Sequence, residues 1–489
     1  MLFSTIEFIV FFVVILAVIT IIKNRQFQHL FLLSASFFFF YYSSNYLLIL
    51  LISSIFLDFY IGKQIWKTDN KNRKKILLLT SISGNLALLG FFKYADFAIL
   101  QFNIIGQELN LTSEIPFLNL ALPIGISFYT FQTITYTVDI YRGKLTPSKS
   151  LKEFALFVSF FPQLVAGPIV RASEFLPQLR AKIQQYETGT KLRQIIIENS
   201  NLKLGITLMA FGFFKKVFIA DNLILLSDAP IPEAELESFM VIIRTIAFGI
   251  RIYCDFSGYT DIAIGAALIL GFKLPINFNK PYFATSPADF WRRWHISLSS
   301  WLRDYLYIPL GGNKKSESRT YLNLIIVMFL GGLWHGASWN FVIWGLLHGA
   351  YLAVHKIILN KFPVLNNLKF FKSKTGRIFS IFVTQYFVFF AWIPFFIADT
   401  DLMLVNMQKY IFLDFLTENT IPFIISQRYA IVIMGFFMLL HIISFKVKNL
   451  PTKISKFGLP YWILFLSFVL FCVLFFYDGG MEPFIYFKF

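Results

Sequence analysis

The first candidate for a catalytic residue in this chain is a histidine inside an apolar run. His335 lies in the segment Gly331–Asn340, where three glycines and two tryptophans surround it. A titratable side chain at membrane depth costs free energy, so it is interpreted first as a functional group. The glycines allow another backbone or a ligand to approach closely. The alternative is a packed histidine whose ring bonds to a neighbouring carbonyl group.

A second cluster lies earlier in the chain and contains another histidine. Ser286, Pro287 and Asp289 are the residue types of a helix start, with a capping hydroxyl, an initial proline and a carboxylate in the first turn. If one helix continued to Tyr305, each residue would be rotated by about 100° around the helix axis from the one before. His295 would then share an apolar face with tryptophans. Such an amphipathic helix lies at the membrane interface or lines a polar cavity. An interfacial anchor is the alternative, but an anchor needs no imidazole on its apolar side.

The polar face of the same expected helix carries three arginines, Arg292, Arg293 and Arg303. Guanidinium groups bind phosphate oxygens through paired hydrogen bonds, so these residues are candidates for holding a phosphorylated donor. The alternative is the ordinary positive charge of a cytoplasmic loop in contact with lipid headgroups. The sequence leaves both interpretations open.

Other polar groups in apolar segments have plainer explanations. Asp255 and Asp261 flank a glycine, and we expect them to bond to helix ends or to neighbouring arginines. His348 and His355 fall on one helical face if the helix is continuous, and packing or an interfacial position explains them.

The composition indicates a membrane protein. Of its 489 residues 57% are hydrophobic, 19% are aromatic and 15% are charged, and a soluble fold could not bury that much apolar surface. Apolar stretches of about 18 residues or more recur throughout, and we expect about 11 to 13 transmembrane or re-entrant helices in an all-α polytopic fold. The stretches 30–62, 238–270 and 321–356 suit either two short crossings or one tilted span. The full set is 4–22, 30–62, 76–100, 117–140, 152–170, 202–228, 238–270, 321–356, 378–398, 428–445 and 460–477.

The charge of the chain predicts its orientation. The net charge is +17, and the excess lies in short loops, which stay on the cytoplasmic side. The first helix precedes Lys23 and Arg25 and lacks a small-residue cleavage site, so we expect a retained helix with an extracytoplasmic N-terminus in a multi-pass plasma-membrane protein. No soluble basic domain is recognisable. Membrane lipids are therefore expected partners and nucleic acids are not.

The motifs of several other protein classes are missing. Cys254 and Cys472 have neither disulfide nor metal-binding spacing, and we expect no metal site. Phosphate-binding loops, nucleophile elbows, His-Glu-x-x-His pairs and dinucleotide fingerprints are missing too. No repeat or long linker divides the chain, so we expect one transmembrane domain over residues 1–489.

Several motifs together resemble the membrane-bound O-acyltransferase family, MBOAT. Trp334–Gly336 downstream of Asp289–His295 is typical of that family, and the chain is similar to its branch of alginate and peptidoglycan O-acetylation membrane proteins. Residues 1–90 match only in hydropathy, whereas 90–489 resembles the family core. Cys254 stands where an aromatic residue is usual, and Lys488 where glutamine is expected. The core motifs are 161–171, 255–263, 286–313 and 331–349, followed by the tail Pro483–Phe489.

The resemblance implies a funnel of helices, open to the cytosol for an acyl donor and to the outside for an acceptor. It also implies that His335 is the catalytic histidine and that His295 holds the second family position, which is Asn or His. Acyl transfer from a thioester to a hydroxyl needs a base of near-neutral pKa and polarisation of the carbonyl. His335 suits the base, and His295 suits orientation of the acceptor or stabilisation of the oxyanion.

Three neighbours of His335 are weaker candidates for binding the donor or substrate, namely Trp334, Ser338 and Asn340. We expect direct attack in a ternary complex, because neither motif supplies an activated nucleophile. Ser338 is the first residue to test if an acyl-enzyme forms. The alternative is a buried hydroxyl bonded to a carbonyl.

These observations predict a membrane O-acetyltransferase that moves acetyl from cytosolic acetyl-CoA across the membrane to a cell-surface polysaccharide of the alginate or peptidoglycan type. No permanently bound cofactor is expected. Relatives in this branch commonly work with an extracytoplasmic acetyltransferase, and no large outer domain is recognisable here, so we expect such a partner. The alternatives are D-alanyl transfer to teichoic acids from a carrier protein, or a transporter that uses the histidines as a proton path.

Overall fold

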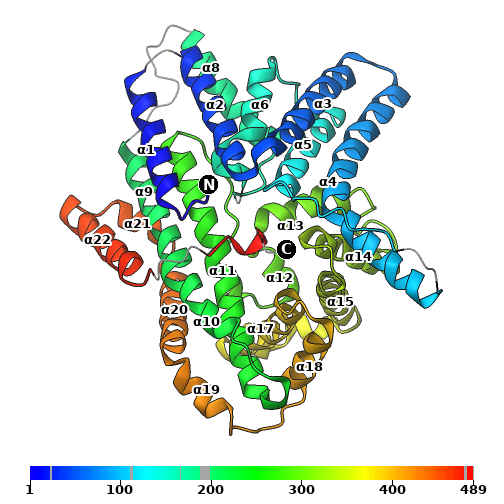
Figure 1. Cartoon of the computed structure of the whole chain (residues 1–489), viewed down its shortest axis with the longest axis vertical. Coiled ribbons are helices and arrows are strands. Elements are labelled where there is room, and N and C mark those ends of the chain that lie inside the picture. Colours follow the sequence, from blue (N-terminus) through cyan, green and yellow to red (C-terminus); the bar gives the residue numbers. More distant parts are fainter. Residues whose placement is uncertain (23–24, 111–113, 166, 188–198, 478–481, 488–489) are drawn as a thin grey trace. The chain divides into compact units, whose positions relative to one another are not determined.

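The computed structural model describes residues 1–22, 25–110, 114–165, 167–187, 199–477 and 482–487. Within these ranges the chain forms α-, 3₁₀- and π-helices and no β-strand, in agreement with the predicted all-α class (Figure 1). The helices group into two compact units, and each is described by itself. Unit 1 comprises Met1–Met209 and Ile262–Pro275, and unit 2 comprises Ala210–Asp261 and Ile276–Phe489. The expectation of a single transmembrane domain stays a prediction.

Unit 1 contains the N-terminal helices. The stretch 30–62, expected to form two short crossings or one tilted span, bends through the 3₁₀ turn Asn45–Leu47, where Asn45 has a φ of 49°. The stretch 152–170 is also divided, because a separate short helix begins at Phe161, with Pro162 in its first turn. The helices are α1 (Ile6–Ile21), α2 (Arg25–Ser44), α3 (Leu48–Lys67), α4 (Lys71–Glu108), α5 (Ile126–Tyr141), α6 (Leu151–Ser159), α7 (Phe161–Leu164), α8 (Ala172–Glu187) and most of α9 (Asn199–Phe213).

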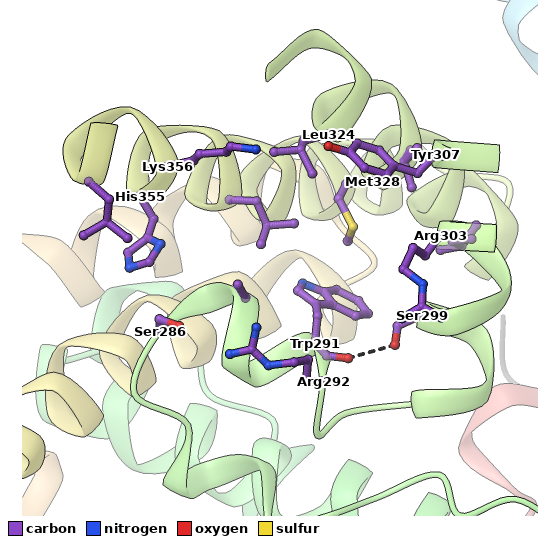
Figure 2. A pocket seen from close by; sticks show the side chains of 15 residues that line it. Ser286, Trp291, Arg292, Ser299, Arg303, Tyr307, Leu324, Met328, His355 and Lys356 are labelled. Atoms are coloured by element: carbon purple, nitrogen blue, oxygen red, sulfur yellow. Dashed lines mark hydrogen bonds between the residues drawn. The ribbon is translucent and has the colours of Figure 1, made fainter. Parts of the chain in front are cut away.

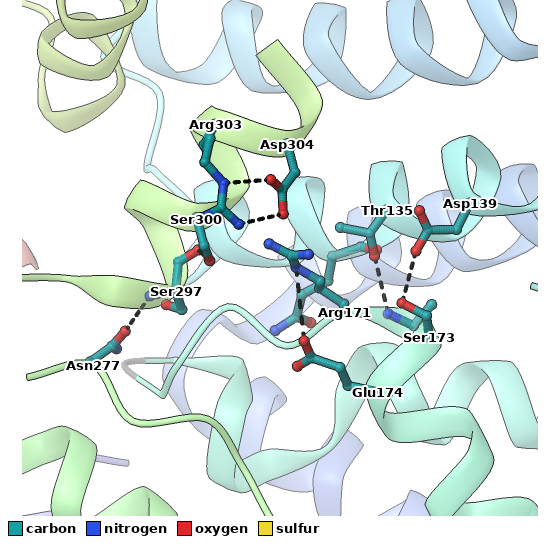
Figure 3. Close-up of polar contacts among 12 residues, drawn as sticks. Thr135, Asp139, Arg171, Ser173, Glu174, Asn277, Ser297, Ser300, Arg303 and Asp304 are labelled. Carbon is teal, nitrogen blue, oxygen red and sulfur yellow. Dashed lines mark hydrogen bonds and ion pairs between the residues drawn. The ribbon is translucent and has the colours of Figure 1, made fainter. Parts of the chain in front are cut away.

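The motif 161–171 lies in unit 1, apart from residue 166, which is outside the described residues. Hydrogen bonds tie the chain just after it to α5. Ala172 donates its backbone N–H to Thr135 Oγ1 at 3.2 Å, and Ser173 Oγ donates to Asp139 Oδ2 at 2.9 Å (Figure 3). The motif itself bonds to α2, because the Phe161 backbone N–H donates to Ser36 Oγ at 3.3 Å, so it contributes to the packing of unit 1.

Unit 2 contains both histidine motifs. It begins with the end of α9, a π-helical segment Phe214–Ala220 and most of α11, and continues through a series of helices of very different length. They are α10 (Ile224–Ser227), α11 (Ser238–Ile269), α12 (Pro287–Trp291), α13 (Ile296–Leu302), α14 (Glu317–His335), α15 (Trp339–Lys361), α16 (Lys369–Lys372), α17 (Lys374–Phe396), α18 (Thr400–Ile411), α19 (Thr420–Ser426), α20 (Arg428–Lys446), α21 (Leu450–Ser455) and α22 (Leu459–Phe475).

Five of the described helical stretches are long and apolar enough to cross a membrane, and the shorter helices α1 and α22 are also apolar. Shorter, interrupted or more polar stretches are not among the five, so this number does not count the 11 to 13 transmembrane or re-entrant helices that were expected. The stretch 202–228, for example, passes from α-helix through π- and 3₁₀-helix. The five are Phe27–Lys67, Lys71–Glu108, Trp339–Lys361, Lys374–Phe396 and Arg428–Lys446.

Helices α14 and α15 form a tight hairpin, so the stretch 321–356 is two helices rather than one. Their backbones approach so closely that a Cβ at Gly332 would collide with the carbonyl oxygen of Phe341, and one at Gly345 with that of Met328. Small residues permit such contact between membrane helices. The hairpin places the end of α14 against the first turns of α15.

Candidate functional site

His335 is the last residue of α14 and is 4% exposed. The chain leaves the helix at Gly336, where a Cβ would collide with the Phe341 ring. It enters α15 at Ser338, whose Oγ accepts a hydrogen bond from the backbone N–H of Asn340 at 3.2 Å. A glycine-enforced turn and a serine cap therefore place the histidine at a helix end inside the fold.

Four aromatic rings surround His335. The distances between ring centroids are 4.8 Å to Trp344, 5.0 Å to Trp334, 5.2 Å to Phe395 and 5.4 Å to Tyr486. These rings come from α15, α14, α17 and the C-terminal segment. Large aromatic rings in such contact restrict the imidazole and exclude water from it. We call these four rings the aromatic cage.

His295 is fully buried and lies in the turn before α13, with a φ of 41° in the left-handed region. Two hydrogen bonds to Asn277 hold this turn: the Ile296 N–H donates to its carbonyl oxygen at 2.9 Å, and the Ser297 N–H donates to its Oδ1 at 3.1 Å, the latter shown in Figure 3. Neither ring nitrogen of His295 has a hydrogen-bond partner among the residues that the structure describes. A buried polar group without a partner costs free energy, as does a left-handed residue other than glycine. Both features indicate a functional position.

Burial lowers the pKa of His295 from 6.5 to about 3. The imidazole is therefore neutral near pH 7, with one nitrogen that can donate and one that can accept a hydrogen bond. A substrate that entered this site would find both nitrogens available.

The two histidines share neighbours. Trp334 lies 6.0 Å from His295 and 5.0 Å from His335, and Tyr486 lies 6.4 Å and 5.4 Å from the same two rings. The structure thus brings together two side chains that the sequence places 40 positions apart (335 − 295). Trp334 lies between them as a shared wall.

Tyr486 is a site residue that the sequence reasoning missed. It lies in the C-terminal segment Glu482–Phe487, in which Phe484 and Ile485 are buried, and its ring is 4.7 Å from that of Phe256 in α11. The tail was recognised as part of the family resemblance, and that was the available signal. Nothing in its spacing showed that it would lie against His335.

The continuous amphipathic helix expected from Ser286 to Tyr305 was wrong. Its start is correct, because Ser286 Oγ accepts a hydrogen bond from the Asp289 backbone N–H at 3.1 Å and Pro287 occupies the first helical position. However, α12 ends at Trp291, and the left-handed turn at His295 separates it from α13. The assignment of one apolar and one polar face therefore does not hold.

The three arginines consequently do not share a helix face. Arg292 is exposed and lies 3.6 Å from Asp289, and Arg293 lies 3.0 Å from the same carboxylate. Arg303 forms a two-bonded pair with Asp304, at 2.7 and 3.1 Å (Figure 3). Arg292 thus has the weakest contact with an acidic partner.

A cavity of about 590 Å³ lies among α12, α13, α14 and α15, and its walls carry four basic side chains (Figure 2). Ser299 Oγ donates to the carbonyl oxygen of Trp291 at 2.8 Å on one side of it. The Trp291 ring lies 5.8 Å from Trp344, which in turn contacts His335. Two aromatic rings therefore lie between the cavity and the catalytic candidate. The basic residues are Arg292, Arg303, His355 and Lys356.

A second cavity, of about 960 Å³, lies among α12, α15 and α17 and includes Arg293 and His348 in its lining. His348 is buried and packs 4.7 Å from Trp344. Because Trp344 precedes His348 by one turn of α15, His348 contacts the cage that surrounds His335.

The remaining polar candidates near His335 have structural contacts. The Asn340 amide donates to the carbonyl oxygens of Ile397 and Ala398 at 2.8 and 3.0 Å, so both amide hydrogens are used within the protein. Ser338 caps α15 rather than bonding to a carbonyl. Within the described ranges, no group of three or more His, Cys, Asp or Glu side chains could hold a metal ion.

The arrangement defines a class: a helical protein with several apolar membrane-length helices, in which two buried histidines share an aromatic environment beside a basic cavity. The sequence model of the MBOAT family, membrane-bound O-acyltransferase, matches residues 144–397, slightly more than half of the chain. The chain belongs to this family. The matched range includes both histidines and all three arginines, but not Tyr486.

Similar proteins agree with this assignment. A peptidoglycan O-acetyltransferase of Helicobacter pylori is 38% identical over 76% of this chain and 72% of its own length. A probable alginate O-acetylase AlgI of Azotobacter vinelandii is 38% identical over 73% of this chain and 69% of its own length. A teichoic acid D-alanyltransferase of Streptococcus thermophilus is 27% identical over 56% of this chain and 66% of its own length. The chain is thus a multi-pass membrane enzyme that transfers acyl groups to hydroxyls, and the predicted family is confirmed.

Proposed function

We propose that this enzyme moves an acetyl group from cytosolic acetyl-CoA across the membrane for O-acetylation of a cell-surface polysaccharide of the alginate or peptidoglycan type. The observation that carries the proposal is the pair of buried histidines around Trp334 and Tyr486, beside a basic cavity. We infer the acetyl group and the class of acceptor from the names of the two relatives at 38% identity. The relative that transfers D-alanine is less similar, at 27%.

In the proposed reaction His335 is the general base. It takes the proton of the acceptor hydroxyl while the oxygen attacks the thioester carbonyl carbon, and the carbon–sulfur bond then breaks. The proton moves from His335 to the departing thiolate, so the base is regenerated. The cage excludes water and thereby favours transfer to the acceptor over hydrolysis of the thioester.

His295 is proposed to act on the same carbonyl or on the acceptor. Its neutral ring has one N–H, which can donate a hydrogen bond to the oxygen that becomes negative during attack. Its two nitrogens have no hydrogen-bond partner among the described residues, which supports the proposal that the substrate provides that partner.

The basic cavity is proposed to hold the phosphates of the donor. Arg292 and Arg303 line it together with His355 and Lys356, and pockets of several hundred Å³ are typical of small-molecule sites. Arg293 lies at the other cavity, so its role as a donor contact has less support than that of Arg292.

Direct transfer remains the proposed path, since Ser338 serves as a helix cap. Tyr486 carries the phenol whose ring lies 5.4 Å from that of His335, so a covalent intermediate must be sought there as well. Mass spectrometry of the intact protein and its peptides after incubation with acetyl-CoA tests this. A stable acetyl group on His335, Ser338 or Tyr486 that is passed on to acceptor would overturn direct transfer.

The cellular arrangement is proposed on the positive loops and the family resemblance. The N-terminus faces the outside of the plasma membrane, lipids surround the apolar helices, and an extracytoplasmic acetyltransferase receives the acetyl group before it reaches the polysaccharide. No permanently bound cofactor takes part.

The deciding experiment measures release of free CoA from acetyl-CoA by the purified protein in lipid, with and without a sugar acceptor. Wild-type turnover that is lost in His335→Ala supports the proposal. The residual rate of His295→Ala then measures how much the second histidine contributes to turnover. Turnover with a D-alanyl carrier protein but none with acetyl-CoA would replace the acetyl assignment by the D-alanyl alternative.

A further inference from the structure

A network of buried charges lies in unit 2 beside the C-terminal segment Glu482–Phe487. Lys216 is 2% exposed, and its Nζ pairs with Asp221 Oδ1 at 2.7 Å and with Asp255 Oδ1 at 2.8 Å. Lys216 comes from the π-helical segment Phe214–Ala220, and Asp255 from α11. Charges removed from water need such partners, so the carboxylate of Asp255 is held in a fixed place.

The other oxygen of the same carboxylate bonds to the C-terminal segment. Asp255 Oδ2 accepts a hydrogen bond from the backbone N–H of Ile485 at 2.7 Å, and Ile485 is itself buried. The preceding Phe484 packs 4.6 Å from the ring of Tyr259, also on α11. A hydrogen bond to a charged acceptor is stronger than one between neutral groups. One charged contact thus fixes the backbone of the segment on α11, beside ring contacts of Phe484 with Tyr259 and Phe256 and of Tyr486 with Phe256.

The residue after this bond is Tyr486, whose ring contacts His335 and His295. We propose that Asp255, its carboxylate held by Lys216, is a positioning residue that fixes the backbone at Ile485 and thereby places the Tyr486 ring as one wall of the histidine site. The catalytic part of this inference rests on the proposed acyl transfer at His335. The mechanical part, that Asp255 holds the segment, does not.

A neighbouring ion pair provides a matched control. Lys215 Nζ pairs with Asp261 Oδ2 at 2.7 Å and donates to Ser257 Oγ at 2.9 Å. This pair joins the same π-helical segment to the same helix α11. Asp261 has no hydrogen bond to Glu482–Phe487 among the described contacts. A general weakening of the fold would follow from loss of either pair, whereas release of the segment would follow only from loss of Asp255.

Two pairs of variants separate these effects. Asp255→Asn removes the charge that binds both Lys216 and the Ile485 N–H, and Asp261→Asn is its control. Ile485→Pro removes the N–H and exchanges one buried apolar side chain for another, leaves the buried ion network intact, and suits the first position of the short 3₁₀ turn found there. Its control is Ile485→Val, which keeps the N–H. If Asp255→Asn fails to fold, the Ile485 pair still tests the proposal.

The first measurement is trimming of the C-terminus by carboxypeptidase Y in lipid nanodiscs, followed by intact mass. We expect removal of Phe487, whose peptide bond joins the same two residues in all five proteins, to be about tenfold faster or more in Asp255→Asn and Ile485→Pro than in the wild type, as loss of one charged hydrogen bond implies. Asp261→Asn and Ile485→Val should be trimmed at the wild-type rate. Equal trimming of all five proteins would overturn the positioning role.

The second measurement is acetyl-CoA turnover by the same proteins. Displacement of Tyr486 should lower kcat about tenfold in Asp255→Asn and Ile485→Pro while leaving the KM for acetyl-CoA unchanged, because the basic cavity is elsewhere. Faster trimming with wild-type kcat would show that the segment does not serve the site, and would overturn that part of the inference. If the wild type itself transfers no acetyl group, the proposed function fails, while the trimming rates still decide whether Asp255 holds the segment.

Discussion

At the scale of single residues, His295 combines burial, a left-handed backbone and a ring without a described partner. Asparagine is the residue other than glycine that tolerates this backbone best, and its amide can also donate a hydrogen bond. The family resemblance likewise allows asparagine at this position. The conformation and the chemistry of the site therefore favour the same substitution.

We predict that His295→Asn keeps at least about a tenth of wild-type turnover, whereas His295→Ala loses about a hundredfold, in line with the loss of one donor to a developing oxyanion. The measurement is kcat for CoA release in the presence of acceptor. A His295→Asn enzyme as inactive as His295→Ala would contradict this prediction, because an amide would then not replace the imidazole as a hydrogen-bond donor.

The arginines differ in how well acidic partners already neutralise them. Arg292 is 69% exposed on its side chain and has one contact at 3.6 Å, whereas Arg303 is paired through two bonds with Asp304. We predict that Arg292→Gln raises the KM for acetyl-CoA about tenfold, and that Arg303→Gln raises it by about threefold or less. The reason is that a guanidinium already bonded to a carboxylate has fewer N–H groups and less net charge available to bind a phosphate. Steady-state kinetics at low salt tests the ranking, and the reverse order would contradict it.

At the scale of elements, the hairpin of α14 and α15 depends on glycines that let the two backbones touch. A methyl group at Gly332 would meet the carbonyl of Phe341, so Gly332→Ala forces the helices apart. We predict a loss of about 1 to 3 kcal/mol in the free energy of unfolding, typical of overpacking, together with reduced turnover because His335 lies at the end of α14.

The control for this prediction is Gly435→Ala in α20, where a new Cβ would meet nothing within 4 Å. It should leave the Tm unchanged or raise it slightly, because alanine favours helix. Thermal unfolding of both variants in lipid makes the comparison. A wild-type Tm for Gly332→Ala would mean that the hairpin is looser than the structure shows.

Local signals were predicted well and distant contacts were not. The start of α12 at Ser286 could be predicted because a serine cap and a proline act within one turn. The break at His295 could not, because it depends on hydrogen bonds to Asn277, in a different part of the chain. The lysine partners of Asp255 and Asp261 were missed for the same reason, since arginines or helix ends were expected.

At the scale of the whole molecule, a buried neutral histidine couples stability to pH. Burial lowers the pKa of His295 from 6.5 to about 3, so within this range the unfolded chain binds a proton that the folded chain does not. The free energy of unfolding therefore falls as the pH falls below 6.5. Between about pH 7 and about pH 5 we predict that the wild type loses about 2 kcal/mol more than His295→Asn. Parallel losses measured by thermal unfolding would contradict this.

The orientation of the chain in the membrane can be tested by labelling introduced cysteines, because its two native cysteines are buried. Asp69 lies in the basic turn between α3 and α4, and Glu114 follows the far end of α4, which spans 38 residues. We predict that Asp69→Cys reacts with an impermeant maleimide only after permeabilisation, and that Glu114→Cys reacts in intact cells. Cys254 and Cys472 are buried and should not react. The opposite labelling pattern would invert the proposed topology.

The contact between His335 and Trp344 has an optical consequence. The indole ring lies 4.8 Å from His335 and 4.7 Å from His348, close enough for a protonated imidazole to quench its emission by accepting an electron from the excited ring. The difference in intrinsic fluorescence between the wild type and Trp344→Phe therefore reports the protonation of these histidines. Protonation of either histidine during turnover is therefore expected to reduce this fluorescence difference, which needs no added dye.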